Sequence, residues 1–448
     1  MSSASQGDES ELSDDERELQ RLVRDAEDEV ASTDETGNTS VSEALDTLPE
    51  DGLEWLFSTT LGEVRQTVIE EFDEPQWRLT EAILSTHATL LLDDRKACTG
   101  LIVVGDSGAG KTTALNFFNG IEEQFYRSDD VTPASFVTAL PSENEETLEK
   151  IDLLPRITHK SLLCPDMATW FSGQTETIRS KMSRMTHLMD GDGFTRDSGS
   201  HGQRGYQGDY RFTFIGASTP LQKRAWRVMG NTGNRFVFYH KPQADDRDLR
   251  DDLFGESTYH EQVEACRNAV HRFLEELWEE YDGYGGVNED FTFTDEAKDA
   301  IEYLARVVKF SRATLPKGEE EPTPNREAPH RVGSMLRDIA RGRALLDRET
   351  TVRTEHVEVS ARIALSTMHK ERRPIVRALL DPANDGVLTT SDVVEAGPSR
   401  PTAVNRIELL DTLDLADSVE DEDDGREPKR LELNSKFEWP DCLEFPEF

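Results

Sequence analysis

Hydrophobic positions divide the chain into three kinds of stretch. Residues 1–50 hold few large apolar side chains among many Asp, Glu, Ser and Thr, too few to offset the entropy cost of ordering. From residue 51 to 94 apolar positions recur at helical spacing. Short apolar runs with polar flanks come next, at residues 100–104, 134–140, 160–167, 210–220 and 234–242. The pattern predicts a disordered acidic tail followed by an α/β core.

The short runs contain little polar alternation, which is typical of strands buried on both faces of a parallel sheet. Helical segments separate them, for example residues 174–190. We therefore expect a three-layer α/β core over residues 51–242, with its N-terminal helices packed against it.

Beyond residue 243 the spacing is helical over most of the chain. We expect an α-helical lid over residues 243–370. The helical stretches beyond residue 243 include 294–314 and 353–380, the second of which continues past the end of the lid. Residues 371–448 give the order helix, turn, helix and β-hairpin, which is that of a winged helix.

The stretch "GDSGAGKTT" follows the first apolar run and precedes a predicted helix. It fits the phosphate-loop pattern G-x-x-x-x-G-K-[ST], whose backbone N–H groups and helix N-terminus cradle a polyphosphate. The sequence predicts ATP bound with Mg²⁺, Lys111 on the β- and γ-phosphates and Thr112 on the metal. The nucleotide-binding residues would be Gly105, Asp106, Ser107, Gly108, Ala109, Gly110, Lys111, Thr112 and Thr113.

Four further residues occupy positions that phosphate-loop ATPases use for phosphate or metal contacts. Asp166 ends an apolar strand, from which its carboxylate would reach Mg²⁺. Thr219 ends another strand, where a hydroxyl can sense the γ-phosphate. Arg235 opens the next strand and suits an arginine finger, and Arg331 begins a lid helix where a second phosphate sensor could lie. Each also has an ordinary interpretation, as a strand-end polar residue or a solvated arginine.

These features resemble the AAA+ ATPases of the minichromosome-maintenance helicase type over roughly residues 75–440. "FTFIGASTP" is similar to their sensor strand ending A-A-N-P, with Thr219 at the Asn position, and "GNRFVFY" is similar to S-R-F-D-L, with Arg235 as the finger. The resemblance implies that Arg331 is the second sensor. It also implies a ring-forming homo-oligomer that acts on DNA.

The chain departs from that family at two points. Met167 follows Asp166 where the family has a Glu that polarises water, and the nearest downstream glutamate is Glu176. No N-terminal oligonucleotide-binding or zinc module precedes the ATPase region, so the chain looks more like a phage- or plasmid-type relative.

Two segments are candidates for DNA contact. Residues 191–211 read as a hairpin with a glycine-rich tip, similar to the pore hairpin of ring helicases, and offer Arg196, His201 and Arg204. The expected recognition helix of the winged helix offers Arg400 and Arg406 toward a major groove. The hairpin could equally be a plain surface hairpin, and the acidic wing equally favours protein interaction.

The charge balance is strongly acidic, with 90 Asp and Glu against 50 Lys and Arg and a net charge of -40. Arginine outnumbers lysine roughly three to one. This composition resembles that of haloarchaeal proteins, and at molar salt a Debye length of about 3 Å screens self-repulsion, so acidity does not exclude DNA. The four cysteines form no C-x-x-C pair, and no long apolar run indicates a membrane span, so we expect a cytoplasmic protein.

Together these features predict an ATP-hydrolysing AAA+ ATPase that acts on DNA in replication or mobile-element maintenance. The alternative is an ATP-dependent, oligomerising DNA-binding switch that does not unwind. The missing glutamate favours the switch, whereas the hairpin favours the motor.

Overall fold

The computed structural model describes residues 59–138, 144–198, 202–232, 235–242, 258–315, 324–420 and 429–446. The predicted acidic tail, residues 1–50, lies outside the described residues. So does His201, at the tip of the predicted hairpin.

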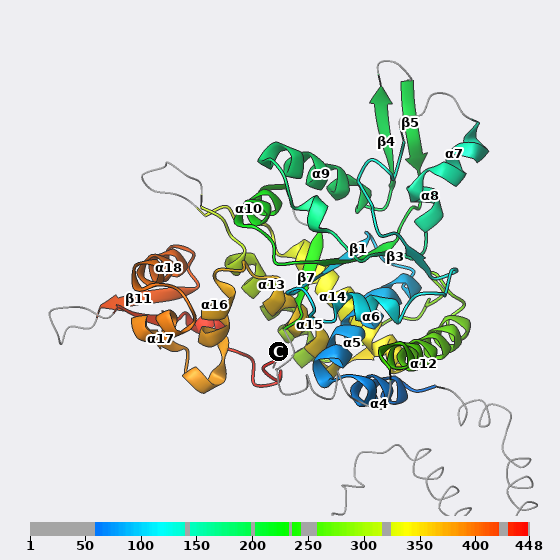
Figure 1. The fold of residues 1–448 in the computed structure, drawn as a ribbon. Helices are drawn as coiled ribbons and strands as arrows, with labels where there is room; N and C mark the ends of the chain where they lie inside the picture. The colour runs from blue at the N-terminus through cyan, green and yellow to red at the C-terminus, as the bar shows by residue number, and fades with distance from the viewer. Residues whose placement is uncertain are drawn as a thin grey trace, which may run out of the picture. The chain divides into compact units, whose positions relative to one another are not determined.

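A five-stranded parallel sheet forms the centre of the core (Figure 1). Its strand order is β2-β3-β6-β1-β7, so that β6 lies between the strand that leads into the phosphate loop and the strand that precedes Asp166. The strands are β1 (Thr99–Val104), β2 (Phe125–Arg127), β3 (Ser161–Cys164), β6 (Thr213–Ser218) and β7 (Phe236–His240). The parallel sheet confirms the α/β prediction.

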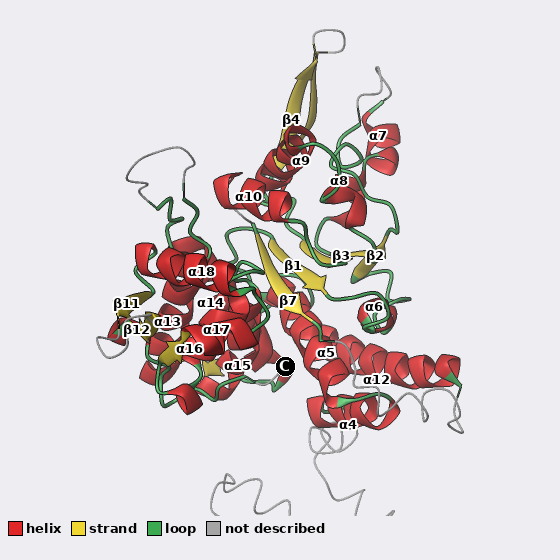
Figure 2. Cartoon of the chain, turned by 60° about the vertical axis from the view of Figure 1, so that its left-hand side comes forward, coloured by secondary structure: helices red, strands yellow, loops and turns green. Residues whose placement is uncertain are grey.

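Alternate residues of β1 belong to two separate cores, one on each face of the sheet. Leu101 and Val103 pack with one apolar cluster, whereas Ile102 and Val104 pack with the other. Side chains of four helices join the first cluster: α4 (Leu61–Glu71), α5 (Glu74–Ala88), α6 (Lys111–Asn116) and α12 (Tyr259–Glu280). Three others join the second: α8 (Leu153–Ile157), α9 (Thr175–Leu188) and α10 (Lys223–Thr232). The two groups lie on opposite sides of the sheet in Figure 2, so the core is three-layered.

A further set of helices, called the lid below, shares the first cluster. Its elements are α13 (Asp295–Ser311), α14 (His330–Leu346), α15 (Thr354–Ser366) and α16 (Arg373–Leu380), with the short parallel pair β8 (Thr292–Phe293) and β9 (Thr351–Val352). The region predicted as a lid, residues 243–370, also contains α12 and ends before α16. The stretch 353–380, expected to be helical throughout, is broken between α15 and α16. Thr367 is the C-cap of α15, and its hydroxyl accepts from the N–H of Phe238 in the edge strand β7 at 2.9 Å.

The C-terminal part holds two helices and a small antiparallel sheet. Helices α17 (Thr390–Glu395) and α18 (Arg400–Thr412) precede the hairpin β11 (Ala416–Glu420) and β12 (Lys429–Leu433), and β10 (Val387–Thr389) completes the sheet order β10-β12-β11. The segment after β12 returns to the lid, where the Tyr303 hydroxyl donates to the carbonyl of Phe437 at 2.8 Å.

Residues 191–211 form the antiparallel pair β4 (Gly193–Ser198) and β5 (Gly202–Gln207), which projects from the core in Figure 1 beside α7 (Glu145–Ile151).

The prediction of a strand at 134–140 was wrong, because residues 131–138 form turns whose apolar side chains Phe136 and Val137 fill the second core. The described residues include no helix that is both long and apolar enough to cross a membrane.

Candidate nucleotide site

The phosphate loop leaves the carboxyl end of β1 and enters α6 at Lys111. Gly108 and Gly110 have φ values of 86° and 76°, in the left-handed region that glycine adopts without a steric penalty. Gly110 is the N-cap of α6. The backbone N–H groups at this helix start therefore remain available to an anion.

Lys111 folds back over its own loop. Its ammonium donates to the carbonyl of Gly105 at 2.9 Å and to the carbonyl of Asp106 at 2.6 Å. Burial lowers the pKa of Lys111, and the carboxylates of Asp106 and Asp166 oppose that shift. The phosphate oxygens of a nucleotide bound in the loop would contact the Lys111 ammonium at this position.

Asp166 and Thr112 supply oxygen donors of the kind Mg²⁺ prefers. Both are exposed, on the loop side of the sheet, and Asp166 is near enough to Lys111 to affect its pKa. One carboxylate oxygen of Asp166 accepts from the N–H of Ala168 at 2.8 Å, which leaves the second oxygen for a ligand. The donor set fits a magnesium ion that also binds phosphate oxygens. Among the described residues no group of three or more His, Cys, Asp or Glu is arranged to hold a metal without such a partner.

Thr113, also predicted to contact nucleotide, forms a hydrogen bond with another residue of the same chain. Its hydroxyl is 2.9 Å from the hydroxyl of Tyr259, at the start of α12. This contact ties the first turn of α6 to α12.

Three residues that support the loop were not identified from the sequence. Asp73 and Gln76 are at the start of α5, and Lys241 directly follows β7. Gln76 is buried and donates to the carbonyl of Gly110 at 3.3 Å. Lys241 is 4% exposed, pairs with Asp73 at 3.5 Å, and its carbonyl lies 2.7 Å from where a Cβ on Gly105 would be. Burial lowers the pKa of Lys241, and Asp73 opposes the shift. The only local signal for Lys241 is its position in "HK" directly after a predicted strand. No local pattern points to Gln76.

Met167 points away from the loop. It is completely buried in the second core, against Gly216 of β6, and its N–H donates to the carbonyl of Ala217 at 2.8 Å. A glutamate at this position would have a buried side chain in this arrangement. Glu176 is on the first turn of α9, where it is exposed and pairs with Arg179 at 3.7 Å.

Thr219 is exposed at the carboxyl end of β6, next to the loop. The preceding residue connects the two, because the carbonyl of Ser218 accepts from the N–H of Gly105 at 3.2 Å. The Ser218 hydroxyl donates to the carbonyl of Thr219 at 2.9 Å. The Thr219 backbone is thus positioned at the carboxyl end of β6, where the loop begins.

Arg235 is held inside its own chain. Its side chain is 13% exposed, forms an ion pair with Asp190 after α9, and donates to the carbonyl of Thr186 at 3.3 Å. To reach a neighbouring subunit it would have to leave Asp190. Arg331 is on the first turn of α14, 40% exposed and paired with Glu327 at 3.2 Å, and no contact joins it to the loop within the described residues.

The hairpin arginines face the core rather than the tip. Arg204 is 12% exposed and pairs at 3.5 Å with Asp152, a fully buried carboxylate that also accepts from the Tyr206 hydroxyl at 2.9 Å and from the N–H of Thr138 at 2.7 Å. Arg196 donates to the carbonyl of Val137 at 3.5 Å. The hairpin strands are thereby connected to Val137 and to Asp152, the residue between α7 and α8.

On α18, Arg400 is exposed at the first turn. Arg406 is half-buried and close enough to His369 and Glu371 to affect the pKa of both, so it faces the lid.

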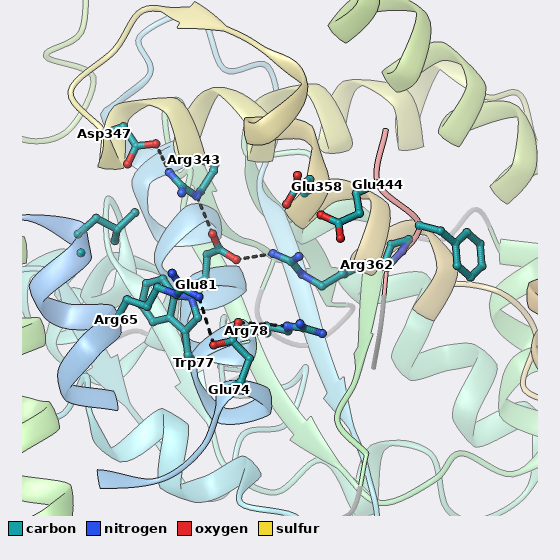
Figure 3. A pocket seen from close by; sticks show the side chains of 14 residues that line it. Arg65, Glu74, Trp77, Arg78, Glu81, Arg343, Asp347, Glu358, Arg362 and Glu444 are labelled. Carbon is teal, nitrogen blue, oxygen red and sulfur yellow. Dashed lines mark hydrogen bonds and ion pairs between the residues drawn. The ribbon is translucent and has the colours of Figure 1, made fainter. Parts of the chain in front are cut away.

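A cavity of about 500 Å³, called the larger cavity below, lies between α4, α5, α14, α15 and the segment 444–446 (Figure 3). Glu81 is at its centre, bonded to Arg343 at 2.7 Å and to Arg362. The other arginines that line it are paired as well, since Glu74 lies 3.4 Å from both Arg65 and Arg78. This cavity is rich in charge, but each arginine has a carboxylate partner.

No family model matches the sequence, and no curated protein matches it. Among solved structures the chain is similar to a full-length MCM homologue from Methanopyrus kandleri, with 12% identity and a TM-score of 0.37. The alignment covers 80% of this chain and 64% of that chain, which is less than two thirds of its length. A match this distant says nothing about activity, so the function has to be argued from the site.

Proposed function

We propose that the chain is an AAA+ ATPase that binds Mg²⁺-ATP at the phosphate loop and acts on DNA. The observation that carries this proposal is the loop itself: Lys111 is bonded to two loop carbonyls at the end of a buried parallel strand, beside Asp166. The end of β6 is bonded to the loop through the Gly105 N–H and the Ser218 carbonyl, and Met167, which follows Asp166, is bonded to β6 in turn, which supports a single site for phosphate and metal.

Within this proposal each residue has a defined role. Lys111 binds the β- and γ-phosphates, and Thr112 and Asp166 hold Mg²⁺, which supplies charge neutralisation at the phosphates. Thr219 senses the γ-phosphate from the end of β6. Arg235 exchanges Asp190 for a neighbour's γ-phosphate in a ring of identical subunits, and Arg331 is a second sensor.

DNA contact is proposed at two places. The β4–β5 hairpin carries Arg196 and Arg204, which are paired with each other across its two strands, and the predicted tip residue His201 lies outside the described residues. The β10–α17–α18–β11–β12 unit has the order of a winged helix, which supports α18, with Arg400 and Arg406, as the recognition helix.

A second candidate is a nucleotide-dependent DNA-binding switch that oligomerises without unwinding. The buried Met167 favours it, because the chain then lacks a carboxylate next to Asp166 to polarise water. In this reading ATP binding rather than turnover sets the conformation.

ATP hydrolysis in molar potassium chloride, with and without single- and double-stranded DNA, tests the proposal. The chosen proteins are wild type, Lys111→Ala and Arg235→Ala. A cooperative motor requires DNA-stimulated turnover that both variants lose. Nucleotide binding without turnover favours the switch. Full activity of Arg235→Ala contradicts an active site shared between neighbouring subunits. Failure of a folded wild type to bind ATP contradicts both candidates.

A further inference from the structure

A second, smaller cavity of about 100 Å³ lies against the first residues of the phosphate loop. The ends of β1 and β7, the turn after β6, α10 and the lid segment between α15 and α16 line it. The lining residues used below are Asp106, Trp226, His240, Ser366, Lys370 and Arg373. At about 30 Å³ per water, this volume suits a single tetrahedral oxyanion and is too small for a nucleobase with its sugar.

Two buried hydrogen-bonding groups in its wall have no partner. The Ser366 hydroxyl is on a residue only 1% exposed, and the Trp226 indole N–H is on a residue 7% exposed. Neither atom has a hydrogen-bond partner among the described residues. Leaving buried polar groups unsatisfied destabilises the fold, so a native cavity that keeps both offers them to a ligand.

The charged groups around the cavity are mainly cations. Arg373 and Lys370 form no ion pair within the part of the chain that the structure describes, whereas Asp106 contributes a carboxylate to the wall. Arg373 is half-buried, and burial together with the nearby Arg377 lowers its pKa to about 10. Burial and Arg373 also lower the pKa of His240 to about 4, which keeps that ring neutral and able to donate one hydrogen bond.

The lid segment that carries these cations is fixed on both sides. Thr367 binds the backbone of Phe238 in β7, and Arg372 donates to the carbonyls of Ser311 at 3.0 Å and Ala313 at 2.6 Å. Lys223 of α10 forms an ion pair with Glu371. The position of Arg373 is therefore set by the fold rather than by a flexible side chain on a free surface.

We propose that this cavity binds a phosphate-type oxyanion through Arg373, Lys370, the Ser366 hydroxyl and the Trp226 indole. The anion has two possible sources: the outermost phosphate of the nucleotide on the loop, or free inorganic phosphate. The first source rests on the proposed function, since it requires ATP at Lys111; the second does not.

The first experiment compares ATP and ADP affinity by calorimetry for wild type, Arg373→Gln, Ser366→Ala and the control Lys298→Gln, an exposed lysine of α13. If the cavity holds the outermost phosphate, Arg373→Gln weakens ATP about tenfold or more and leaves ADP unchanged, because one charge-assisted hydrogen bond is lost. Ser366→Ala removes only a hydroxyl and has a smaller effect in the same direction. Melting curves show whether each variant is folded.

The second experiment titrates inorganic phosphate without nucleotide and follows tryptophan fluorescence, with Trp226→Phe to isolate the indole in the wall. A Trp226-dependent change that Arg373→Gln abolishes and Lys111→Ala retains assigns the cavity to free phosphate. If folded wild type binds neither nucleotide, the proposed function fails while this titration still tests the cavity. An unchanged ATP-to-ADP ratio in Arg373→Gln and Ser366→Ala, together with no phosphate signal, overturns the inference.

Discussion

The two cavities beside α15 differ in how their charges are balanced. The larger one contains four arginines, and each faces Glu74 or Glu81. The smaller one contains Arg373 and Lys370 without an ion-pair partner among the described residues, together with two unsatisfied hydrogen-bonding groups. Size and charge density alone would favour the larger cavity as a ligand site. Ion pairing favours the smaller one, because its two cations lack carboxylate partners among the described residues, whereas every arginine of the larger cavity is paired. The larger cavity has its own unsatisfied atom, the Nε of Arg362, but that guanidinium is ion-paired with Glu81.

The larger cavity should therefore matter for folding and hardly at all for binding. Glu81→Ala leaves Arg343 and Arg362 without their shared, buried carboxylate. We expect the free energy of unfolding to fall by about 3–5 kcal/mol, as for other broken buried pairs. Chemical denaturation measures it.

The matched control for this change is Glu74→Ala, on the same helix and in the same cavity. Its carboxylate is 35% exposed, so its pairs are worth at most about 1 kcal/mol. Equal losses for the two variants would contradict the distinction between buried and exposed pairs. A large loss of ATP affinity in folded Glu81→Ala would contradict the structural role of the cavity.

His87, on the same helix α5, extends the comparison to a fully buried group whose charged form burial disfavours. Its Nδ1 lies 2.7 Å from the Ser161 hydroxyl and its Nε2 lies 3.1 Å from the Gln124 carbonyl oxygen. Burial lowers the pKa of His87 to about 3, although the hydrogen bond to Gln124 opposes the shift. The unfolded chain, with a pKa near 6.5, therefore binds one more proton between pH 6.5 and about 3.

Stability should accordingly fall as the pH is lowered through that window, by at most about 1.4 kcal/mol per pH unit from this residue. Unfolding free energies of wild type and His87→Gln, measured at several pH values from 4.5 to 7, isolate the contribution. The wild type should show the steeper slope. Identical slopes would mean that His87 is not held neutral.

The smallest expected effect on stability is at Arg373. Because this arginine lacks an ion-pair partner in the described residues, Arg373→Gln should change the free energy of unfolding by less than about 0.5 kcal/mol. Its neighbour Arg372 serves as the contrast, since Arg372→Gln leaves the carbonyls of Ser311 and Ala313 without their donor and should cost about 2 kcal/mol. If denaturation shows Arg373→Gln to be as damaging as Arg372→Gln, Arg373 has a structural partner and the smaller cavity loses its main cation.

Local patterns predicted the elements that are locally determined. The phosphate loop, the buried strands around it and the hairpin at 191–211 each follow from glycine placement or from apolar runs of the correct length. The short edge strand β2 was missed, because three residues, Phe125–Arg127, carry too little pattern. Residues 134–140 were assigned as a strand because apolar turns that fill a core have the same composition.

The missing parts of the site depend on contacts between distant residues. Gln76 and Lys241 meet the loop from helices and strands far away in sequence, and Arg204 finds Asp152 across 52 residues. At the break between α15 and α16, the C-cap residue Thr367 binds Phe238 of β7, another contact between distant residues. Periodicity cannot report such pairs, so the lid cations of the smaller cavity could not be assigned from the sequence.

The central claim is that the phosphate loop binds a nucleotide through Lys111. Calorimetric titration of Mg²⁺-ATP into wild type and Lys111→Ala in molar potassium chloride, with Lys298→Gln as the control, tests it most directly. We predict saturable binding by wild type and by the control, and affinity about 100-fold weaker in Lys111→Ala, because two charge-assisted contacts to phosphate are lost. Equal binding by folded Lys111→Ala, or none by folded wild type, would contradict the claim.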